Sequence, residues 1–298
     1  MSRIDIVVPC HNYARFLRQS VESVLEQSHR ELRVLVIDDA STDETPAIAA
    51  ELAERDSRVS FRRHTVNCGH ILTYNEGIEW AESEYMLLLD ADDFLFPGAL
   101  KRAIDVLDTM PEIGLAWGPC IDYRDGDSLP IQTLGPVESG TEVLDATAFV
   151  RALAEGNCVP QSAAIVRTSV QKRQGGYLME LPHAGDLEMW VRFALHSKVV
   201  RVKTTQSAYR LHDSNMSRAY RGIPDFEQCR NVFRLHYRDI RDSLHNGAEL
   251  ETWIRRHYAW WALKWAKRAL TQGESETCRK LLMGAARDVA GIWCRDLR

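Results

Sequence analysis

The sequence lacks any apolar run long enough to cross a membrane. No stretch approaches the roughly 18 uncharged apolar residues that a bilayer-spanning helix needs. The first residues lead directly into a predicted strand, without the charged segment and long apolar segment of a secretory signal. We therefore expect a cytoplasmic protein and leave open a position at the inner face of the cell membrane.

Paired cysteines and strong charge are also missing. No two of the seven cysteines form a CxxC pair, so a zinc site is not expected, and their odd number indicates reduced thiols. The net charge of -5 is mild and gives no sign of a nucleic-acid-binding surface. The 298 residues, nearly half of them apolar, suit one large α/β domain with an appendage, or two small domains.

The first hundred residues alternate between strand and helix patterns. Apolar runs predict buried strands over residues 4–8, 32–37 and 85–89, and a further strand is expected over 59–63. Helical spacing predicts helices over 16–26, 41–54 and 73–81. In the second of these helices we expect Ser41 to be the N-cap and Glu44 its capping-box partner. This order predicts a parallel sheet with helices on both faces.

Polar side chains follow three of the four predicted strands. Pro9-Cys10-His11-Asn12 follows the first, Asp38-Asp39 ends the second, and Asp90-Ala91-Asp92-Asp93 follows the fourth. Ligands of open α/β sheets bind beyond the carboxyl ends of the strands. These segments are therefore the strongest candidates for a binding site.

The remainder of the chain is less regular until its helical end. Residues 97–206 mix helices with short strands, and Gly, Pro and Asp between Gly118 and Gly140 predict an irregular or hairpin-like excursion. From about Pro224 onward the spacing is helical. One of these helices mixes tryptophans with basic residues, which suits either an anionic membrane surface or packing on the catalytic domain or another subunit.

Three carboxylates within four positions, Asp90, Asp92 and Asp93, repel one another at a strand end. A Mg²⁺ or Mn²⁺ ion would relieve that repulsion and would bridge one or two carboxylates to phosphates. A solvated acidic turn is the alternative, because a D-x-D sequence is common. Asp39 could accept a hydrogen bond from a nucleobase or ribose, or could belong to a turn before the next helix.

Several segments in a fixed order together resemble the family 2 glycosyltransferases. They are IVVPCHNY at 6–13, SVLEQS at 23–28, VIDDASTD at 36–43, the residues Asn67, Gly69, Asn75 and Gly77, and LDADD at 89–93. Each segment alone is common, but their joint order and spacing over the first hundred residues are specific.

The resemblance implies the GT-A fold, in which a Rossmann-like nucleotide-binding half is fused to an acceptor-binding half. On that basis we expect a catalytic domain over residues 1–223, divided into 1–97 for the nucleotide sugar and 98–223 for the acceptor. Residues 224–298 would form a C-terminal helical extension.

The resemblance also implies roles on the donor side. Pro9 and His11 would line the base pocket, and Asp39 would bind the base or ribose. Asp92 would be the principal metal ligand, with Asp90 near the ribose and the metal. Asn12, Asn75 and Ala91 are the further nucleotide-sugar-binding candidates.

Two later blocks supply the catalytic candidates. LPHAGDLEMWVR at 181–192 resembles the family's Glu-Asp-x-Asp-x-Trp block, which puts Asp186 at the position of the catalytic base. Glu188, two residues on, would point elsewhere on a helix. Tyr209-Arg210-Leu211-His212 resembles a late motif, in which His212 would lie near the metal or diphosphate and Arg210 would help hold the diphosphate.

The predicted activity is inverting, metal-dependent transfer of a sugar from a nucleoside-diphosphate sugar to a hydroxyl acceptor, in glycan, polysaccharide or glycolipid synthesis. A UDP-sugar is favoured, with a sugar or lipid-linked acceptor, and the sequence leaves a homodimer open. Departures from the family pattern, Tyr74 where many relatives have Arg and His11 in place of another aromatic, leave the nucleotide open, and Gly185 replaces a Glu. Alternatives are a non-catalytic nucleotide-sugar-binding protein and a nucleotidyltransferase of similar fold.

Overall fold

The N-terminal part of the chain forms alternating strands and helices in the computed structural model, which describes residues 2–127 and 140–293. The strands are β1 (Ile4–Cys10), β2 (Leu32–Asp38), β3 (Val59–Arg63) and β4 (Tyr85–Leu88). The helices between them are α1 (Ala14–Leu25), α2 (Thr45–Arg55) and α3 (His70–Trp80). The strands pair in parallel, as predicted, and their order in the sheet is β3-β2-β1-β4. Every residue of β1 is buried, which explains why the strand is apolar apart from Asp5.

The expected capping box at the start of α2 is wrong. The helix begins at Thr45 with Glu44 at the N-cap position, and no side chain caps it. The Ser41 hydroxyl instead accepts a hydrogen bond from the backbone N–H of Asn12 at 2.8 Å. Asp43 accepts from the backbone N–H of Thr45 at 3.0 Å and of Ala14 at 3.1 Å. The polar residues before α2 therefore join the loops after β1 and β2.

Beyond β4 the large sheet is mixed. It continues with β9 (Ala164–Arg167), β6 (Ile113–Trp117), β10 (Lys198–Val202) and β8 (Thr141–Leu144), in the order β4-β9-β6-β10-β8. A small second sheet contains β5 (Phe94–Leu95), β11 (Ser207–Arg210) and β7 (Cys120–Tyr123). The irregular segment expected between Gly118 and Gly140 includes β7, and its residues 128–139 lie outside the described part of the chain.

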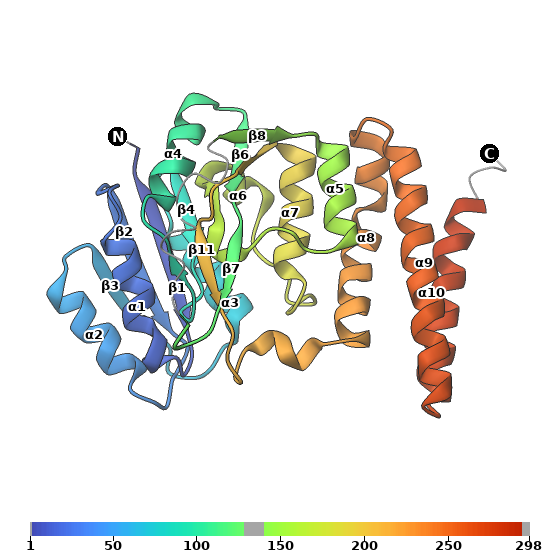
Figure 1. Ribbon diagram of the computed structural model, residues 1–298, viewed down its shortest axis with the longest axis horizontal. Helices are drawn as coiled ribbons and strands as arrows, with labels where there is room; N and C mark the ends of the chain where they lie inside the picture. The colour runs from blue at the N-terminus through green and yellow to red at the C-terminus, as the bar shows by residue number, and fades with distance from the viewer. Residues whose placement is uncertain (1, 128–139, 294–298) are drawn as a thin grey trace.

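Helices cover both faces of this sheet and continue into a helical end (Figure 1). The later ones are α4 (Ala99–Thr109), α5 (Ala146–Glu155), α6 (Thr168–Gln174) and α7 (Gly185–His196), with short 3-10 turns η2 (Gln161–Ala163) and η3 (Met216–Tyr220). The end of the chain forms α8 (Ile223–Ser243), α9 (Gly247–Thr271) and α10 (Ser275–Trp293). This agrees with the helical pattern expected from about Pro224.

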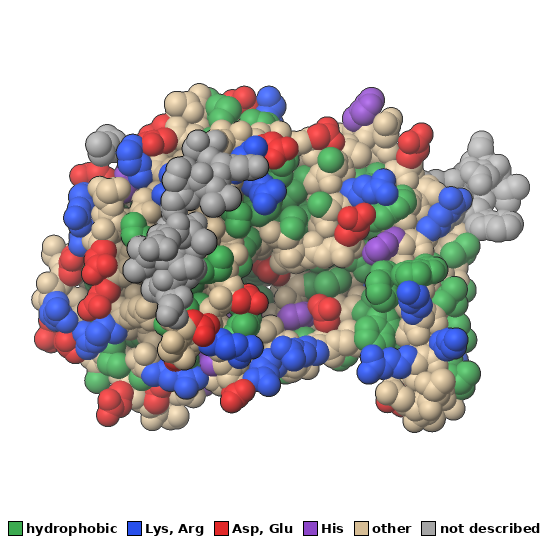
Figure 2. All heavy atoms as spheres, in the orientation of Figure 1, with side chains coloured by type: hydrophobic (Ala, Val, Ile, Leu, Met, Phe, Trp, Pro, Cys, Tyr) green, Lys and Arg blue, Asp and Glu red, His purple; other side chains and the backbone are tan. Residues whose placement is uncertain are grey.

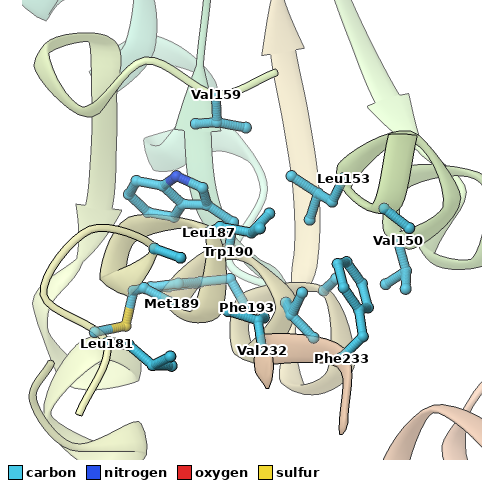
Figure 3. Packing of buried hydrophobic residues seen from close by; sticks show 14 of the residues in the cluster. Val150, Leu153, Val159, Leu181, Leu187, Met189, Trp190, Phe193, Val232 and Phe233 are labelled. Carbon is cyan, nitrogen blue, oxygen red and sulfur yellow. The ribbon is translucent and has the colours of Figure 1, made fainter. Parts of the chain in front are cut away.

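The core places α7 between the sheet and the C-terminal helices. Trp190 and Phe193 of α7 are buried among Leu153 of α5 and Phe233 of α8 (Figure 3). At 2% exposure or less, both aromatic side chains are fixed by packing. The start of α7, where Asp186 lies, is therefore held by a rigid helix.

A close approach between α3 and β1 depends on glycine. A Cβ atom added at Gly77 would lie 2.5 Å from Cγ1 of Val7.

The six cysteines within the described residues have free thiols, as expected. Within those residues, no helix combines the length and the apolar composition needed to cross a bilayer.

Candidate active site

A cavity of about 570 Å³ lies at the carboxyl edge of the parallel strands. Cys10 at the end of β1 is paired with Asp38 at the end of β2, so the segments after both strands meet there. Eight of the eleven predicted site residues line this cavity: Pro9, His11, Asn12, Asp39, Asp90, Ala91, Asp92 and Asp186. The other three, Asn75, Arg210 and His212, are not part of its wall.

His212 nevertheless reaches the carboxylate cluster. Its Nε2 lies 2.9 Å from Oδ2 of Asp92, and its Nδ1 lies 2.9 Å from the Ser214 hydroxyl. The rings of Phe16 and Tyr13 hold the imidazole, with centroids 4.7 and 5.7 Å away. The pair joins the segment after β4 to the segment after β11, and it offers one oxygen and one nitrogen to a divalent cation.

Asp90 and Asp93 occupy different environments on either side of Asp92. Burial and the negative charge of Asp92 raise the pKa of Asp90 to about 7, although the Tyr74 hydroxyl donates to it at 2.8 Å. Burial also raises the pKa of Asp93, which points away from the cavity and accepts from the backbone N–H of Arg210 at 2.9 Å. Asp93 is therefore a structural group, and excess negative charge is concentrated on Asp90 and Asp92.

Arg210 does not lie where the late motif predicts. Its side chain is 2% exposed and lies behind the carboxylate cluster, where Nε donates to the backbone carbonyl of Asp92 at 2.7 Å. Its other nitrogens bond Gln19 and Asp125. The guanidinium lies against three aromatic rings, those of Phe16, Phe94 and Tyr123. With its donors occupied in this way, Arg210 supports the backbone of Asp92 and does not face the cavity.

Asp39 is fixed by the loop before α3. One oxygen accepts from the backbone N–H of Cys68 at 2.7 Å, and the other from that of Gly69 at 2.8 Å. Burial alone would raise the pKa of this carboxyl, but these donors and His64 lower it, so Asp39 is held as an anion. The neighbouring Asp38 is also buried, but it holds the turn by accepting from the backbone N–H of Ser41.

His64 is a residue of this network that the sequence pattern did not single out. Its Nδ1 lies 2.7 Å from Asp39 Oδ1 and its Nε2 lies 2.7 Å from Glu76 Oε2. Burial lowers its pKa, but the two carboxylates outweigh burial and raise it. The position could have been found, because His64 follows β3 and so lies at the same sheet edge as the other polar strand ends.

Potential metal ligands also meet around His64. Oxygen, nitrogen and sulfur atoms of Asp39, His64 and Cys68 lie within 4.8 Å of one another. Asp39 and His64 are already hydrogen-bonded to each other, and their bonds to Cys68 and Glu76 account for the cluster. The excess charge that would attract a cation lies instead at Asp90 and Asp92.

Asp186 stands at the first turn of α7 and lines the same cavity as the strand ends. Its Oδ1 accepts from the backbone N–H of Leu187 and its Oδ2 from the Asn157 amide, both at 2.7 Å. Burial raises its pKa above the ordinary value, against the lowering effects of these two bonds and of His183. Such a carboxylate is well suited to take up a proton.

Glu188 has a different environment, as expected from its helical position. It is 1% exposed and does not line the cavity. Its Oε2 accepts from Arg192 at 2.6 Å, and its Oε1 lies 2.7 Å from Nε2 of His236 on α8. Glu188 is therefore an ionic link between α7 and α8.

Asn75, like Arg210, does not line the cavity. Its amide donates to the carbonyl of Tyr177 at 3.0 Å and accepts from the N–H of Tyr177 at 2.7 Å. Tyr177 lines the cavity, packs edge-on against Tyr74, and bonds Gln161 through its hydroxyl. Both polar atoms of the Asn75 amide are thus bonded to the backbone of Tyr177, through which Asn75 contacts the cavity wall.

Comparison with known proteins identifies relatives for the first half of the chain. Residues 5–144 match the family model described as glycosyl transferase family 2. An uncharacterized glycosyltransferase of Nostoc sp. is 31% identical over 137 residues, or 45% of this chain and 42% of the relative. Another uncharacterized glycosyltransferase, of Rickettsia typhi, is 24% identical over 214 residues, which cover 71% of this chain and 64% of the relative. The chain thus spans about two fifths to two thirds of these relatives.

Solved structures extend the likeness to nearly the whole fold. The S. aureus TarS fragment 1–349 in complex with UDP-GlcNAc superposes with a TM-score of 0.72 at 17% identity, covering 95% of this chain and 79% of that one. The mannosyltransferase PcManGT of Pyrobaculum calidifontis, in complex with GDP-Man and Mn²⁺, superposes with a TM-score of 0.65 at 19% identity, covering 97% and 81%. At these identities the likeness concerns the fold, and the expected GT-A architecture is confirmed.

Proposed function

We propose that this chain, whose residues 5–144 match the glycosyl transferase family 2 model, transfers a sugar from a nucleoside-diphosphate sugar to a hydroxyl acceptor. One observation carries the proposal. A single cavity is lined by an anionic nucleotide-side carboxylate, Asp39, by the pair Asp90 and Asp92, and by a fourth carboxylate, Asp186, on another element. Residues 98–223 would supply the acceptor half.

The nucleotide would lie between the ends of β1 and β2. Asp39 Oδ2 accepts one hydrogen bond, from Gly69, and so keeps a lone pair for an N–H or hydroxyl of the nucleoside. Nδ1 of His11 lies 2.7 Å from the Asp39 carbonyl, and this contact holds the ring beside Pro9 at the cavity wall. Asn12 and Ala91 lie on the same wall. A UDP-sugar is the favoured donor, and the TarS fragment that shares this fold is a UDP-GlcNAc complex.

The donor set around Asp92 fits a divalent cation, Mg²⁺ or Mn²⁺. Asp92 and His212 would hold it, with Asp90 beside the ribose and the ion. Burial and the negative charge of Asp92 raise the pKa of Asp90, and the hydrogen bond described for its carboxyl comes from the neutral Tyr74 hydroxyl. When bound, the ion would stabilise the negative charge of the leaving diphosphate. Its identity is part of the proposal, and PcManGT with the same fold is a Mn²⁺ complex.

Asp186 would be the catalytic base. The acceptor hydroxyl would transfer its proton to a carboxylate oxygen of Asp186 while the hydroxyl oxygen attacks the anomeric carbon. The bond between that carbon and the nucleoside diphosphate breaks in the same step, which inverts the configuration. Asn157 and Leu187 fix the carboxylate by the hydrogen bonds described above, so little orientation is lost when the acceptor binds.

A thermal-shift screen of UDP-sugars and GDP-sugars, with and without Mn²⁺, tests the donor half. A donor present at about 100 times its Kd should add roughly 2.7 kcal/mol of stability. Release of nucleoside diphosphate on adding acceptor sugars then tests transfer. No stabilisation by any nucleotide sugar would contradict the proposal. Stabilisation without any release would leave a non-catalytic binding protein.

A further inference from the structure

The C-terminal helix α9 has an outward face with two kinds of side chain. Apolar residues on it are unusually exposed: Trp260 50%, Trp261 37%, Leu263 51% and Leu270 61%. The exposed polar side chains between them are mostly basic, at Arg256, Lys264, Lys267 and Arg268. We call these eight residues the α9 face. Figure 2 shows hydrophobic and basic side chains interspersed over the C-terminal helices at the right of the view.

The fold does not use this face internally. The opposite side of α9 is buried, through Leu250, Ile254, Tyr258, Ala262 and Ala266. Two of its tryptophans belong to the protein body: Trp253 and Trp265 pack against the core, and Arg151 of α5 lies over the Trp253 ring at 4.3 Å. Packing on the body thus accounts for two of the helix tryptophans and leaves Trp260 and Trp261 without partners in the core.

The charge of the face is uncompensated. Residues 252–273 contain five basic side chains and no acidic one. Among the described residues, no ion pair involves Arg256, Lys264, Lys267 or Arg268. The Lys264 ammonium lies 3.6 Å from the Trp260 ring centre and 5.1 Å from that of Trp261, so cation and aromatic rings form one unit. Exposed indole rings beside lysines suit the boundary between lipid headgroups and acyl chains.

A second copy of the chain fits the face less well. In a twofold dimer the same patch meets itself, so the basic residues of the two copies would face one another without acidic partners. An anionic lipid surface offers negative charge to the basic side chains of the face and an apolar phase to its indole rings. We therefore propose that the α9 face binds anionic membranes as a peripheral contact.

The position of the face relative to the cavity gives this contact a use. The second half of α9 runs toward the same edge of the molecule as the carboxyl ends of β1 and β2 (Figure 1). A membrane at that edge would bring the cavity close to a lipid-linked acceptor. That consequence rests on the proposed function, whereas lipid binding itself does not, and the two can fail separately.

Vesicle flotation of the full chain tests the inference. Vesicles of phosphatidylcholine alone are compared with vesicles that also contain phosphatidylglycerol, at low and at high salt. We expect the protein to float with the anionic vesicles at low salt and to be released by high salt, because exposed charges are then screened. Lys264→Gln with Lys267→Gln should weaken this binding by at least about tenfold. Trp260→Ala with Trp261→Ala should weaken it by a similar factor.

A matched control comes from α8. Leu235→Ala with Arg238→Gln removes an exposed apolar side chain and an exposed cation from another C-terminal helix and should leave flotation unchanged. The melting temperature of each variant, measured without ligand, verifies that it is folded. Absence of flotation with anionic vesicles would overturn the inference, as would equal flotation of all variants. The inference would also be overturned if light scattering showed a dimer that only the Trp260→Ala with Trp261→Ala variant loses, because a second copy of the chain would then cover the face.

Discussion

Nε2 of His212 lies 2.9 Å from Oδ2 of Asp92, although 120 residues separate them in the chain. The contact is made possible by the small sheet, in which β11 pairs with β5 directly after the Asp92 segment. Arg210, two residues before His212, fixes the backbone of Asp92 from behind. The proposed metal ligands are thus positioned by the same short strand.

The first prediction concerns metal dependence. Asp92→Asn should abolish both transfer and the Mn²⁺-dependent part of donor binding, because it removes the principal proposed ligand. His212→Ala should lower the apparent metal affinity by about 10- to 100-fold. Titration of activity with Mn²⁺, after treatment with a chelator, measures both effects.

Asp93→Asn is the matched control for that titration. Burial raises the pKa of Asp93, so an amide resembles the form that the buried site favours. This variant should keep the wild-type midpoint for Mn²⁺. An unchanged midpoint in His212→Ala would exclude His212 as a ligand.

The second prediction concerns the base. Asp186→Asn should lower the transfer rate by about 10²- to 10⁴-fold, because an amide cannot accept the acceptor's proton. The amide keeps the shape of the side chain, and donor binding should therefore change little. Transfer assays and donor-induced thermal shifts measured on the same sample separate the two effects. Full activity in this variant would remove Asp186 from the mechanism.

The third prediction concerns pH. Burial raises the pKa of Asp186, and the group is active only when ionised. At low pH the carboxyl is protonated, so kcat/KM should rise with pH by about tenfold per unit below that pKa and level off above it. Asn157→Ala removes a bond that lowers this pKa, so the rising limb should move to higher pH.

The position of that limb distinguishes two roles for Asn157. If Asn157 only contacts the acceptor, the variant should change KM and leave the limb where it was. A limb that stays in place while Asp186→Asn is inactive would show that some other group sets the pH dependence.

Local sequence patterns predicted the parallel sheet of the first four strands and the polar segments of the cavity wall because both depend on neighbours along the chain. The ends of β1, β2 and β4 carry their polar residues directly after the apolar runs that place them. Asp39 and Asp92 could therefore be assigned to one edge from the sequence. His64 follows β3 in the same way, and the same rule would have included it.

Side-chain partners far along the chain could not be predicted in this way. Asn75 and Arg210 stand at positions that resemble the family pattern. The Asn75 amide is hydrogen-bonded to Tyr177, and the Arg210 guanidinium is hydrogen-bonded to Gln19 and Asp125. Such occupancy depends on tertiary contacts between distant segments, which the spacing of residues along the chain does not reveal. The capping box failed for the same reason, since the Ser41 hydroxyl is used by the backbone of Asn12.

The last prediction separates two carboxylates on one helix. Glu188 is buried with Arg192 and His236, and Glu188→Gln would leave both without their anion. We expect a loss of unfolding free energy on the order of 3 kcal/mol, because the remaining polar groups stay buried without their charged partner. Urea denaturation measures it. Asp186→Asn, two residues earlier on the wall of the cavity, should change the unfolding free energy by less than about 1 kcal/mol.

The two variants should thus show opposite profiles. Glu188→Gln should keep substantial transfer activity at a temperature where it is folded, whereas Asp186→Asn should be stable and inactive. If Glu188→Gln were fully stable and inactive, Glu188 would have to face the acceptor. That outcome would require α7 to rotate about its axis, and Trp190 and Phe193, packed at 2% exposure or less, oppose such a rotation.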